Sequence, residues 1–463
     1  MPGMDLVVTN GTLVTPGGLV RTDIGIDDAS IAGMTEDLRG EFEIDAHGCY
    51  VLPGAIDPHV HLQMPVGDGS NPNVVSSDDF ASGTRAAVLG GTTTVVDFVE
   101  PKPGETFIEA LHRRQEDADG HVVIDYGLHM TIPAWHAARP QCLAQLSEVV
   151  AAGVSSFKLY TAYEGFRLDD TQLLDVVGAV REVGGLPMVH CENGPICEHL
   201  RAQALGQGKT APIYHAVTRP PRQEAEAVSR VIDIAALAAS PVYIAHVSCC
   251  SALSRIRTAR ARGESVYSET CPQYLFLDQS ALMGPQGERL ICAPPLRTAE
   301  DREALWIGLR RGDIDVVSTD HCPFQTATKE GHSDFTSVPG GLPSIEARLG
   351  LVYDALAERG MGVECLSELC STRSAQIFGL GRKGEIAVGL DADLVIFDPQ
   401  REVTIAAGET LHENVDWTPY AGLHIRGWAR DVISRGELVV SDGQFVGHLG
   451  RGRFVPRTRT ELR

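Results

Sequence analysis

The chain lacks the cysteine spacing of a disulfide scaffold or a zinc finger. Its 11 cysteines are an odd number, and none of them forms a Cys-x-x-Cys pair. Several lie in apolar runs that are typical of strands, among them Cys49, Cys191 and Cys271. We therefore expect reduced, mostly buried thiols and no disulfide framework.

Positive charge and long apolar runs are also scarce. There are 39 Lys and Arg against 61 Asp and Glu, and the formal net charge of −22 disfavours binding to nucleic acid and to anionic membranes. No stretch approaches the ~20 apolar residues that a membrane span needs. The first residues lack the basic and apolar regions of a signal peptide. We expect a cytoplasmic protein with neither nucleic acid nor membrane as a partner.

Both ends of the chain have the pattern of short strands. Near the N-terminus, apolar runs at 6–8, 11–14, 24–26 and 30–32 are separated by turn residues. The tail repeats this pattern at 384–389, 393–397 and 432–440. We expect residues 1–53 and 380–463 to pair into one small β-sandwich domain, with the centre of the chain inserted between them.

The centre, residues 54–379, alternates between apolar β-branched runs and helix-like stretches. One predicted helix runs from Asp169 to Gly185 and another from Thr298 to Gly312. The strand-like runs lie near 51–60, 92–99, 122–130, 154–160, 186–190, 242–247, 265–269 and 314–319. This alternation predicts an α/β fold, a (β/α)8 TIM barrel. An open doubly wound sheet is the alternative, but it normally has a Gly-rich turn after its first strand.

Six polar residues stand at the predicted C-terminal ends of barrel strands, where active sites of such barrels are built. In the His-x-His pair of the first strand, residues i and i+2 point the same way, so both imidazoles can reach one metal. Each histidine alone would more often be a core residue, but together they favour a metal site. The six are His59, His61, Lys158, His190, His246 and Asp320.

Lys158 needs a separate explanation, because a metal ion repels an ammonium group. Burial in an apolar strand lowers the pKa of a lysine, and a neutral amine can add CO₂ to form an anionic carbamate. Such a carbamate has two oxygens and can bridge two metals. The alternative is a lysine that reaches a surface carboxylate, which the apolar residues around Lys158 disfavour.

These residues, in this order, resemble the amidohydrolase superfamily, and in particular its cyclic amidohydrolases: dihydropyrimidinases, hydantoinases and allantoinases. The resemblance covers nearly the whole chain. It includes the segments 57–65, 90–94, 155–158, 189–193, 243–248, 269–274, 293–297, 318–323 and 389–395.

The resemblance implies two zinc ions per chain, although these ligand types also accept Mn or Co. His59, His61 and Asp320 would bind one ion, and His190 and His246 the other. Carboxylated Lys158 and a hydroxide would bridge them. Tyr163 would stabilise the oxyanion and Asp320 would carry the proton. His321, which follows Asp320, should point to the opposite face of the strand, so we expect it either to support the ligands from behind or to be structural.

The implied substrate is a small cyclic amide. Gln63 stands where dihydroorotases have an Arg that pairs with a substrate carboxylate, so an acidic ring is disfavoured. Ala293 and Gly340 would contact the ring amide through their backbones. The implied reaction opens 5,6-dihydropyrimidines or 5-substituted hydantoins to N-carbamoyl amino acids.

Allantoinase, or hydrolysis of another cyclic imide or ureide, is the alternative activity, because Ala293 and Gly340 differ from the usual hydantoinase residues. The loop 66–73, with Leu62, Met64 and Phe157, is expected to shape the pocket for the ring substituent. A scaffold homologue without catalysis is the alternative of another class, but all six ligand positions are present. The resemblance also implies a homotetramer.

Overall fold

The computed structural model describes residues 4–66 and 74–458 of the chain. Its centre is a sheet of eight strands in the spatial order β15-β14-β13-β12-β11-β10-β9-β8, with each strand parallel to its neighbours. A parallel bridge between Val60 and His321 brings the chain after β8 against the chain after β15, which closes the sheet. The predicted (β/α)8 TIM barrel is therefore confirmed. The strands are β8 (Ala55–Asp57), β9 (Thr92–Val99), β10 (Asp125–Thr131), β11 (Ser156–Tyr160), β12 (Leu186–His190), β13 (Val242–Ile244), β14 (Val266–Thr270) and β15 (Val316–Val317).

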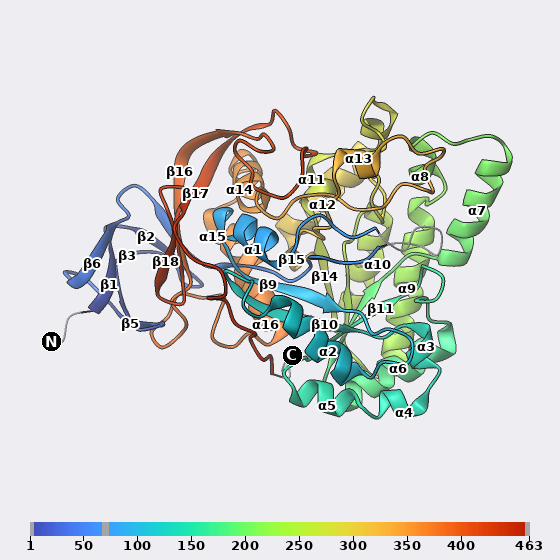
Figure 1. Cartoon of the computed structure of the whole chain (residues 1–463), viewed down its shortest axis with the longest axis horizontal. Helices are drawn as coiled ribbons and strands as arrows, with labels where there is room; N and C mark the ends of the chain where they lie inside the picture. The colour runs from blue at the N-terminus through green and yellow to red at the C-terminus, as the bar shows by residue number, and fades with distance from the viewer. Residues whose placement is uncertain (1–3, 67–73, 459–463) are drawn as a thin grey trace.

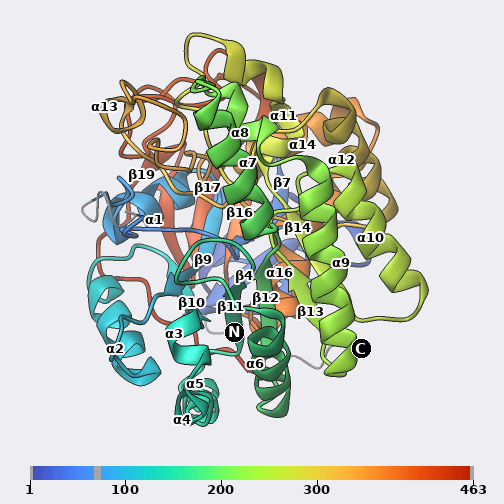
Figure 2. The same cartoon turned by 90° about the vertical axis from the view of Figure 1, so that its right-hand side faces the viewer.

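Helices surround these strands, and Figure 2 shows α2, α6, α9 and α10 on the outside of the barrel. The predicted helix after Asp169 is α6, which begins where the Asp169 carboxylate accepts a hydrogen bond from the Gln172 backbone N–H at 2.8 Å. The helix α12 is capped by Thr298 and ends at Gly312, which has a φ of +72°. The principal outer helices are α1 (Phe80–Leu89), α2 (Phe107–Ala118), α5 (Leu146–Ala151), α6 (Asp170–Glu182), α9 (Pro221–Leu237), α10 (Cys250–Ala261), α12 (Ala299–Arg311) and α14 (Arg348–Glu358).

Further helices, most of them short, lie in the connections between these elements. They are α3 (Ala134–Ala137), α4 (Pro140–Leu143), α7 (Gly194–Gly206), α8 (Ile213–Val217), α11 (Pro272–Phe276), η1 (Gln279–Met283), α13 (Thr326–Lys329), α15 (Val363–Ser367), η2 (Glu368–Thr372) and α16 (Arg373–Phe378). Several of them follow barrel strands on the side where the strands end. They therefore help to form the walls of the cavity described below.

The two ends of the chain meet in a second region beside the barrel, as Figure 1 shows. One sheet has the order β5-β4-β1-β6, and the other has the order β19-β18-β17-β16-β7-β2-β3. Strand β7 pairs with β16 in register Leu52 to Val395, which joins early and late parts of the chain as predicted. The strands are β1 (Met4–Thr9), β2 (Thr12–Thr15), β3 (Gly18–Arg21), β4 (Asp23–Asp27), β5 (Ser30–Thr35), β6 (Gly40–Asp45), β7 (Tyr50–Pro53), β16 (Leu394–Thr404), β17 (His424–Ser434), β18 (Glu437–Ser441) and β19 (Gln444–Phe445).

Three of the predicted strands differ from the structure. The run 432–440 is a hairpin, because β17 ends at Ser434 and β18 begins at Glu437. The run 51–60 is divided at Gly54, where a Cβ atom would lie 2.1 Å from Thr93 Oγ1, so the chain leaves one sheet and enters the barrel at this glycine. The run 384–389 is a turn region and not a strand, since Gly384 and Gly389 both have a φ of +89°. Ile386 within it is nevertheless buried among side chains of the end sheets.

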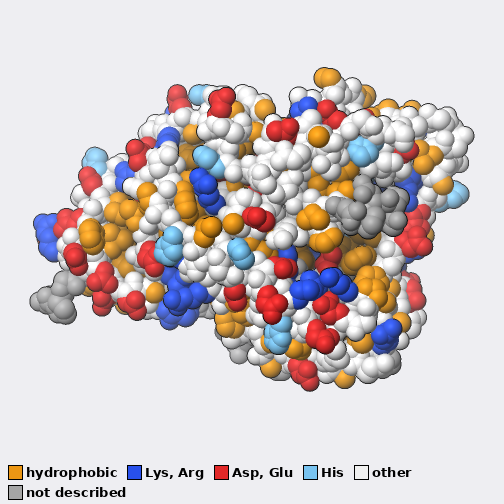
Figure 3. All heavy atoms as spheres, viewed as in Figure 1, with side chains coloured by type: hydrophobic (Ala, Val, Ile, Leu, Met, Phe, Trp, Pro, Cys, Tyr) orange, Lys and Arg blue, Asp and Glu red, His pale blue; other side chains and the backbone are white. Residues whose placement is uncertain are grey.

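The surface has mixed charge. On the face shown in Figure 3, Lys and Arg side chains are scattered among Asp and Glu side chains. Among the residues that the structure describes, no helix has both the length and the apolar character for crossing a membrane. All 11 cysteines are free, and most of them are buried, as predicted.

Candidate active site

The six predicted ligands converge at the end of the barrel where its strands finish. Lys158 lies within β11 and His190 is the last residue of β12, whereas His59, His246 and Asp320 follow their strands by two or three residues. All six line one cavity. The predicted convergence is therefore present, although the His59 and His61 pair lies just beyond its strand and not on it.

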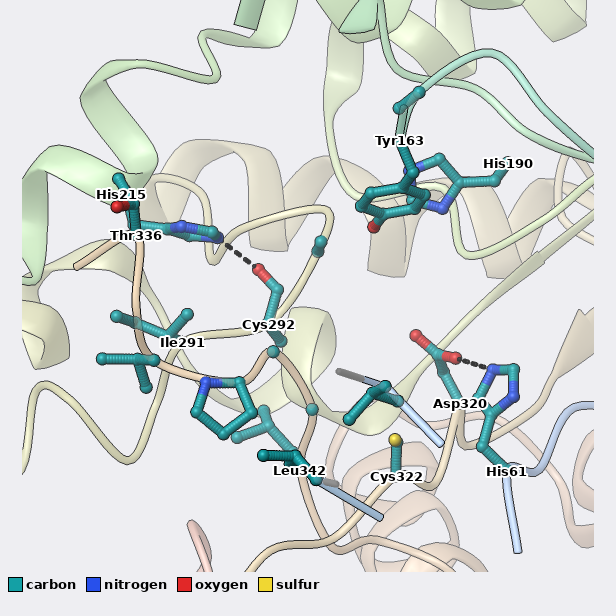
Figure 4. A pocket seen from close by; sticks show the side chains of 18 of the residues that line it. His61, Tyr163, His190, His215, Ile291, Cys292, Asp320, Cys322, Thr336 and Leu342 are labelled. Atoms are coloured by element: carbon teal, nitrogen blue, oxygen red, sulfur yellow. Dashed lines mark hydrogen bonds and ion pairs between the residues drawn. The ribbon is translucent and has the colours of Figure 1, made fainter. Parts of the chain in front are cut away.

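His59, His61 and Asp320 form one half of this cluster. The Nε2 atoms of His59 and His61 lie 3.2 Å and 3.1 Å from the same oxygen, Oδ1 of Asp320. Their possible ligand atoms all lie within 4.8 Å of one another. Figure 4 shows Asp320 and His61 together, with Tyr163 and His190 across the cavity from them. Two imidazoles and a carboxylate in this geometry can hold one metal ion.

His190 and His246 form the other half. Nδ1 of His190 lies 2.9 Å from Nε2 of His246, and the two rings meet edge to face. Nε2 of His190 is 3.0 Å from a Glu192 carboxylate oxygen, which leaves Nδ1 directed into the cluster. Nδ1 of His61 and Nδ1 of His246 are buried without a hydrogen-bond partner. Unpartnered imidazole nitrogens beside a carboxylate fit a site for metal ions.

Lys158 lies between the two halves and is 1% exposed. Its Nζ atom is 3.3 Å from Nε2 of His59 and lies near the rings of Phe98 and Tyr160. Burial lowers the pKa of Lys158, although Asp320 and Glu269 act in the opposite direction. CO₂ reacts with the neutral amine, and the lowered pKa increases the fraction of Lys158 that is neutral.

Burial also determines the protonation of the other site residues. It lowers the pKa of His59, His190 and His246, so these imidazoles are neutral and able to bind metal near pH 7. Burial by itself raises the pKa of Asp320, but His59, His61 and Lys158 outweigh it and lower the value to about 2. Asp320 is therefore a carboxylate.

Three residues of the site have backbones in the left-handed region. The φ angles are +69° for Tyr163, +36° for His246 and +53° for Asp320. For residues other than glycine this conformation costs on the order of 1–3 kcal/mol, and it concentrates at functional sites. The barrel thus holds these side chains in positions that a relaxed chain would not adopt.

Glu269, at the end of the seventh strand, was not predicted to have a role. Its carboxylate accepts hydrogen bonds from Nδ1–H of His59, from the His246 backbone N–H at 3.2 Å and from the Tyr243 hydroxyl at 2.9 Å. The bond to His59 directs Nε2 of that ring toward Asp320 and Lys158. Its place beside the other strand-end residues is the signal that could have identified it.

His321 has the structural role that we predicted. Its Nε2 atom is 2.9 Å from a carboxylate oxygen of Asp78, and its Nδ1 atom accepts a hydrogen bond from the Ser344 backbone N–H at 3.1 Å. The ring is fully buried and is not among the residues that line the cavity. Its hydrogen bonds therefore fix the backbone directly after Asp320.

The cavity has a volume of about 1140 Å³, which is ample for a substituted five- or six-membered ring. Tyr163, Ala293 and Gly340, for which we predicted substrate contacts, are among the residues that line it. The Tyr163 ring lies tilted against the His190 ring, with a centroid distance of 4.9 Å. Tyr163 is 37% exposed, but desolvation by the surrounding cavity wall raises the pKa of its hydroxyl despite the nearby Arg219, so the hydroxyl keeps its proton and can donate.

The structure does not bring every predicted residue to the cavity. Gln63 is exposed and, among the described residues, does not line it. Leu62 and Phe157 belong to the hydrophobic core. Phe157 does so because side chains alternate along a strand, which turns it away from the side that carries Lys158. Met64 does line the cavity, and residues 67–73 of the expected substituent loop lie outside the described residues.

Comparisons with known proteins agree with this geometry. A D-hydantoinase from Geobacillus stearothermophilus is 43% identical over 98% of this chain and 97% of its own length. A D-hydantoinase from Streptomyces coelicolor is 40% identical over 97% of each chain. The crystal structure of dihydropyrimidinase from Brevibacillus agri superposes with a TM-score of 0.95 at 42% identity, covering 99% of this chain and 100% of that one. The amidohydrolase family itself matches residues 50–439. With this match, and with relatives so similar over their full length, the chain belongs to the amidohydrolase family.

Proposed function

We propose that this protein is a cyclic amidohydrolase that opens 5,6-dihydropyrimidines or 5-substituted hydantoins to N-carbamoyl amino acids. The observation that carries the proposal is the convergence of four imidazoles, Lys158 and Asp320 in one cavity. The full-length similarity to enzymes named D-hydantoinase and dihydropyrimidinase supports it.

The family depends on metal ions, and we propose two zinc ions per chain for this member. His59, His61 and Asp320 would hold one, and His190 and His246 would hold the other. Nζ of Lys158 would attack the carbon of CO₂ and release one proton, which gives a carbamate with two oxygens for the two metals. When bound, the metals would activate water as a nucleophile and polarise the scissile carbonyl.

The protein's own groups would carry the remaining chemistry. Asp320 would accept a proton from the attacking water and deliver it to the ring nitrogen as the C–N bond breaks. The Tyr163 hydroxyl would donate a hydrogen bond to the carbonyl oxygen as negative charge develops on it. The free backbone groups of Ala293 and Gly340 would orient the ring amide.

Substrate choice rests on the cavity and on the relatives. Gln63 is neutral and, among the described residues, does not line the cavity. That position therefore offers no positive charge to pair with an acidic ring. The names of the relatives favour hydantoins and dihydropyrimidines over allantoin, and they favour the D-enantiomer. We therefore expect an N-carbamoyl-D-amino acid as the product of a 5-substituted hydantoin.

A substrate panel on enzyme supplied with zinc tests the proposal. Dihydrouracil and 5-benzylhydantoin should be opened, with the benzyl product resolved by chiral chromatography, while dihydroorotate should be inert. Faster turnover of allantoin than of both would assign the alternative activity. A chain that binds no metal and opens none of these rings would be a scaffold and not an enzyme.

We also propose that the protein acts in the cytoplasm as a homotetramer. The resemblance to cyclic amidohydrolases supports this assembly. Light scattering coupled to size-exclusion chromatography would measure the mass of the particle directly. A monomeric mass under the assay conditions would contradict the proposed assembly.

A further inference from the structure

Two chain segments form one wall of the cavity side by side. The first contains Ile291, Cys292 and Ala293, and the second runs from Val338 to Leu342. The Gly341 backbone N–H donates to the Ile291 carbonyl at 3.0 Å and is a direct link between them. Gly341 has a φ of +149°, which only glycine adopts readily, and Gly340 precedes it. Glycines of this kind leave the second segment with little stiffness of its own.

Lys329, at the end of α13, connects both segments. Its side chain is completely buried. Its Nζ atom donates to the backbone carbonyls of Ile291 at 2.7 Å, Pro339 at 2.8 Å and Gly341 at 3.0 Å. An ammonium group has three N–H donors, and each one here has an acceptor.

Two neighbouring backbone carbonyls that do not contact Lys329 accept hydrogen bonds from other side chains. His215 Nε2–H donates to the Cys292 carbonyl at 2.8 Å, a contact that Figure 4 shows, and the Tyr274 hydroxyl donates to the Pro294 carbonyl at 2.8 Å. Within the described chain, the backbone groups of Ala293 and Gly340 make no hydrogen bond. The first segment therefore leaves the backbone of Ala293 free, the second leaves those of Val338 and Gly340 free, and all three residues line the cavity.

The partners of Lys329 differ from those of a structural buried lysine in the same chain. Lys383 is 5% exposed and pairs with carboxylates, at 2.8 Å from Asp125 and 2.5 Å from Asp393. Lys329 forms no ion pair with a carboxylate among the described residues, and its partners are all backbone carbonyls of the cavity wall. Burying an ammonium without a counter-ion is costly, and burial lowers the pKa of Lys329 to about 7, so its charged form depends on the three carbonyl acceptors. A role in fixing the wall explains why the site retains it.

We propose that Lys329 is a positioning residue, which sets the separation of the Ala293 and Gly340 backbones and thereby the affinity for the ring amide. This inference rests on the proposed function. Without the ammonium group, three carbonyls would lose their donor and the glycine segment would relax. A substrate would then have to order the wall as it binds, which weakens binding more than chemistry.

The test compares K329M with K383M. For K329M we expect KM to rise about tenfold for both hydantoin and 5-benzylhydantoin, with kcat changed by less than about threefold and two metals retained. An equal rise for both substrates indicates the ring contact and not the substituent pocket. K383M removes a buried ammonium far from the wall, so its melting temperature should fall while KM stays within about twofold of the wild-type value.

Chemical rescue gives an independent readout. In K329A, added n-propylammonium should lower KM toward the wild-type value in a saturable manner, because it restores three N–H donors. Tetramethylammonium, which has none, should not. Should K329M be insoluble, K329Q can still donate two hydrogen bonds and should show a KM raised by less than about tenfold.

Three outcomes would overturn the inference. One is an unchanged KM in the Lys329 variant that folds, and another is a KM rise in K383M as large as that in K329M. The third is a wild-type enzyme that opens no cyclic amide, which would overturn the proposed function and this inference with it. If the wild type is active and the Lys329 variant has the same KM, the inference about Lys329 is overturned but the proposed function is not.

Discussion

Replacing Glu269 by glutamine should weaken metal binding without unfolding the barrel. The carboxylate accepts from His59 Nδ1–H, from the His246 backbone N–H and from the Tyr243 hydroxyl. In E269Q the amide can place its NH₂ beside Tyr243, since a hydroxyl can turn to accept. The remaining carbonyl still accepts from His59, but without the negative charge that made the imidazole a stronger ligand.

The expected loss of metal affinity follows from the hydrogen bond between Glu269 and His59. Removing a partner of a metal-binding histidine typically lowers metal affinity by about 10- to 100-fold, which corresponds to about 1.4–2.7 kcal/mol. Competition with a chromophoric chelator would measure the zinc affinity, and the ion that we propose for His59, His61 and Asp320 should be released first. Thermal unfolding of the metal-free variant should match that of the metal-free wild type.

E346Q is the matched control. Glu346 is also a buried carboxylate paired with a histidine, with His412 Nδ1 at 2.8 Å, but it does not line the cavity. Its substitution should leave zinc affinity unchanged. The reasoning would be refuted by an E269Q variant with wild-type zinc affinity, or by an equal loss of zinc in E346Q.

Three further predictions concern the site and its surroundings. K158A should lose both metals and activity, and a normal zinc content by atomic absorption would exclude the carbamate. Y163F should lower kcat by about 100-fold at unchanged metal content, because one oxyanion donor is lost, and steady-state kinetics showing wild-type kcat would remove that role. Burial raises the pKa of Glu413 from 4.5 to about 7. The unfolded chain therefore ionises first, and the stability of the wild type falls between these pH values. E413Q should gain stability over the wild type from about pH 5 to about pH 8, by at most about 3 kcal/mol, and urea unfolding that shows no such pH dependence would contradict this.

The barrel and the main site residues were predictable because they depend on local patterns. The runs of β-branched residues locate the strands, and parallel strands in a closed barrel must bring their C-terminal ends together. Once the strands are located, the histidines, Lys158 and Asp320 must meet. The caps at Asp169 and Thr298 are equally local, since each involves a side chain and a backbone group three residues apart.

The supporting residues could not be predicted in the same way. The strand-end position of Glu269 marks it as a candidate, but its partner His59 lies far away in sequence, as Ile291 does from Lys329, and no spacing rule identifies such partners. For Gln63 the resemblance predicted a substrate contact, but the residue is exposed and, among the described residues, does not line the cavity. The turn at 384–389 has an apolar pattern that suits a strand, but the φ angles of its glycines exclude one.

The pairing of β7 with β16 has a consequence for synthesis of the protein. Strand β7 leaves the ribosome early, but its neighbour β16 follows only after every barrel strand has emerged. At translation rates of about 5–20 residues per second, β7 would wait for roughly 20–70 s with an open hydrogen-bonding edge. The nascent chain therefore carries a strand with one unpaired, aggregation-prone edge for most of its elongation, and co-expressed chaperones that cover such edges should raise the yield of this protein.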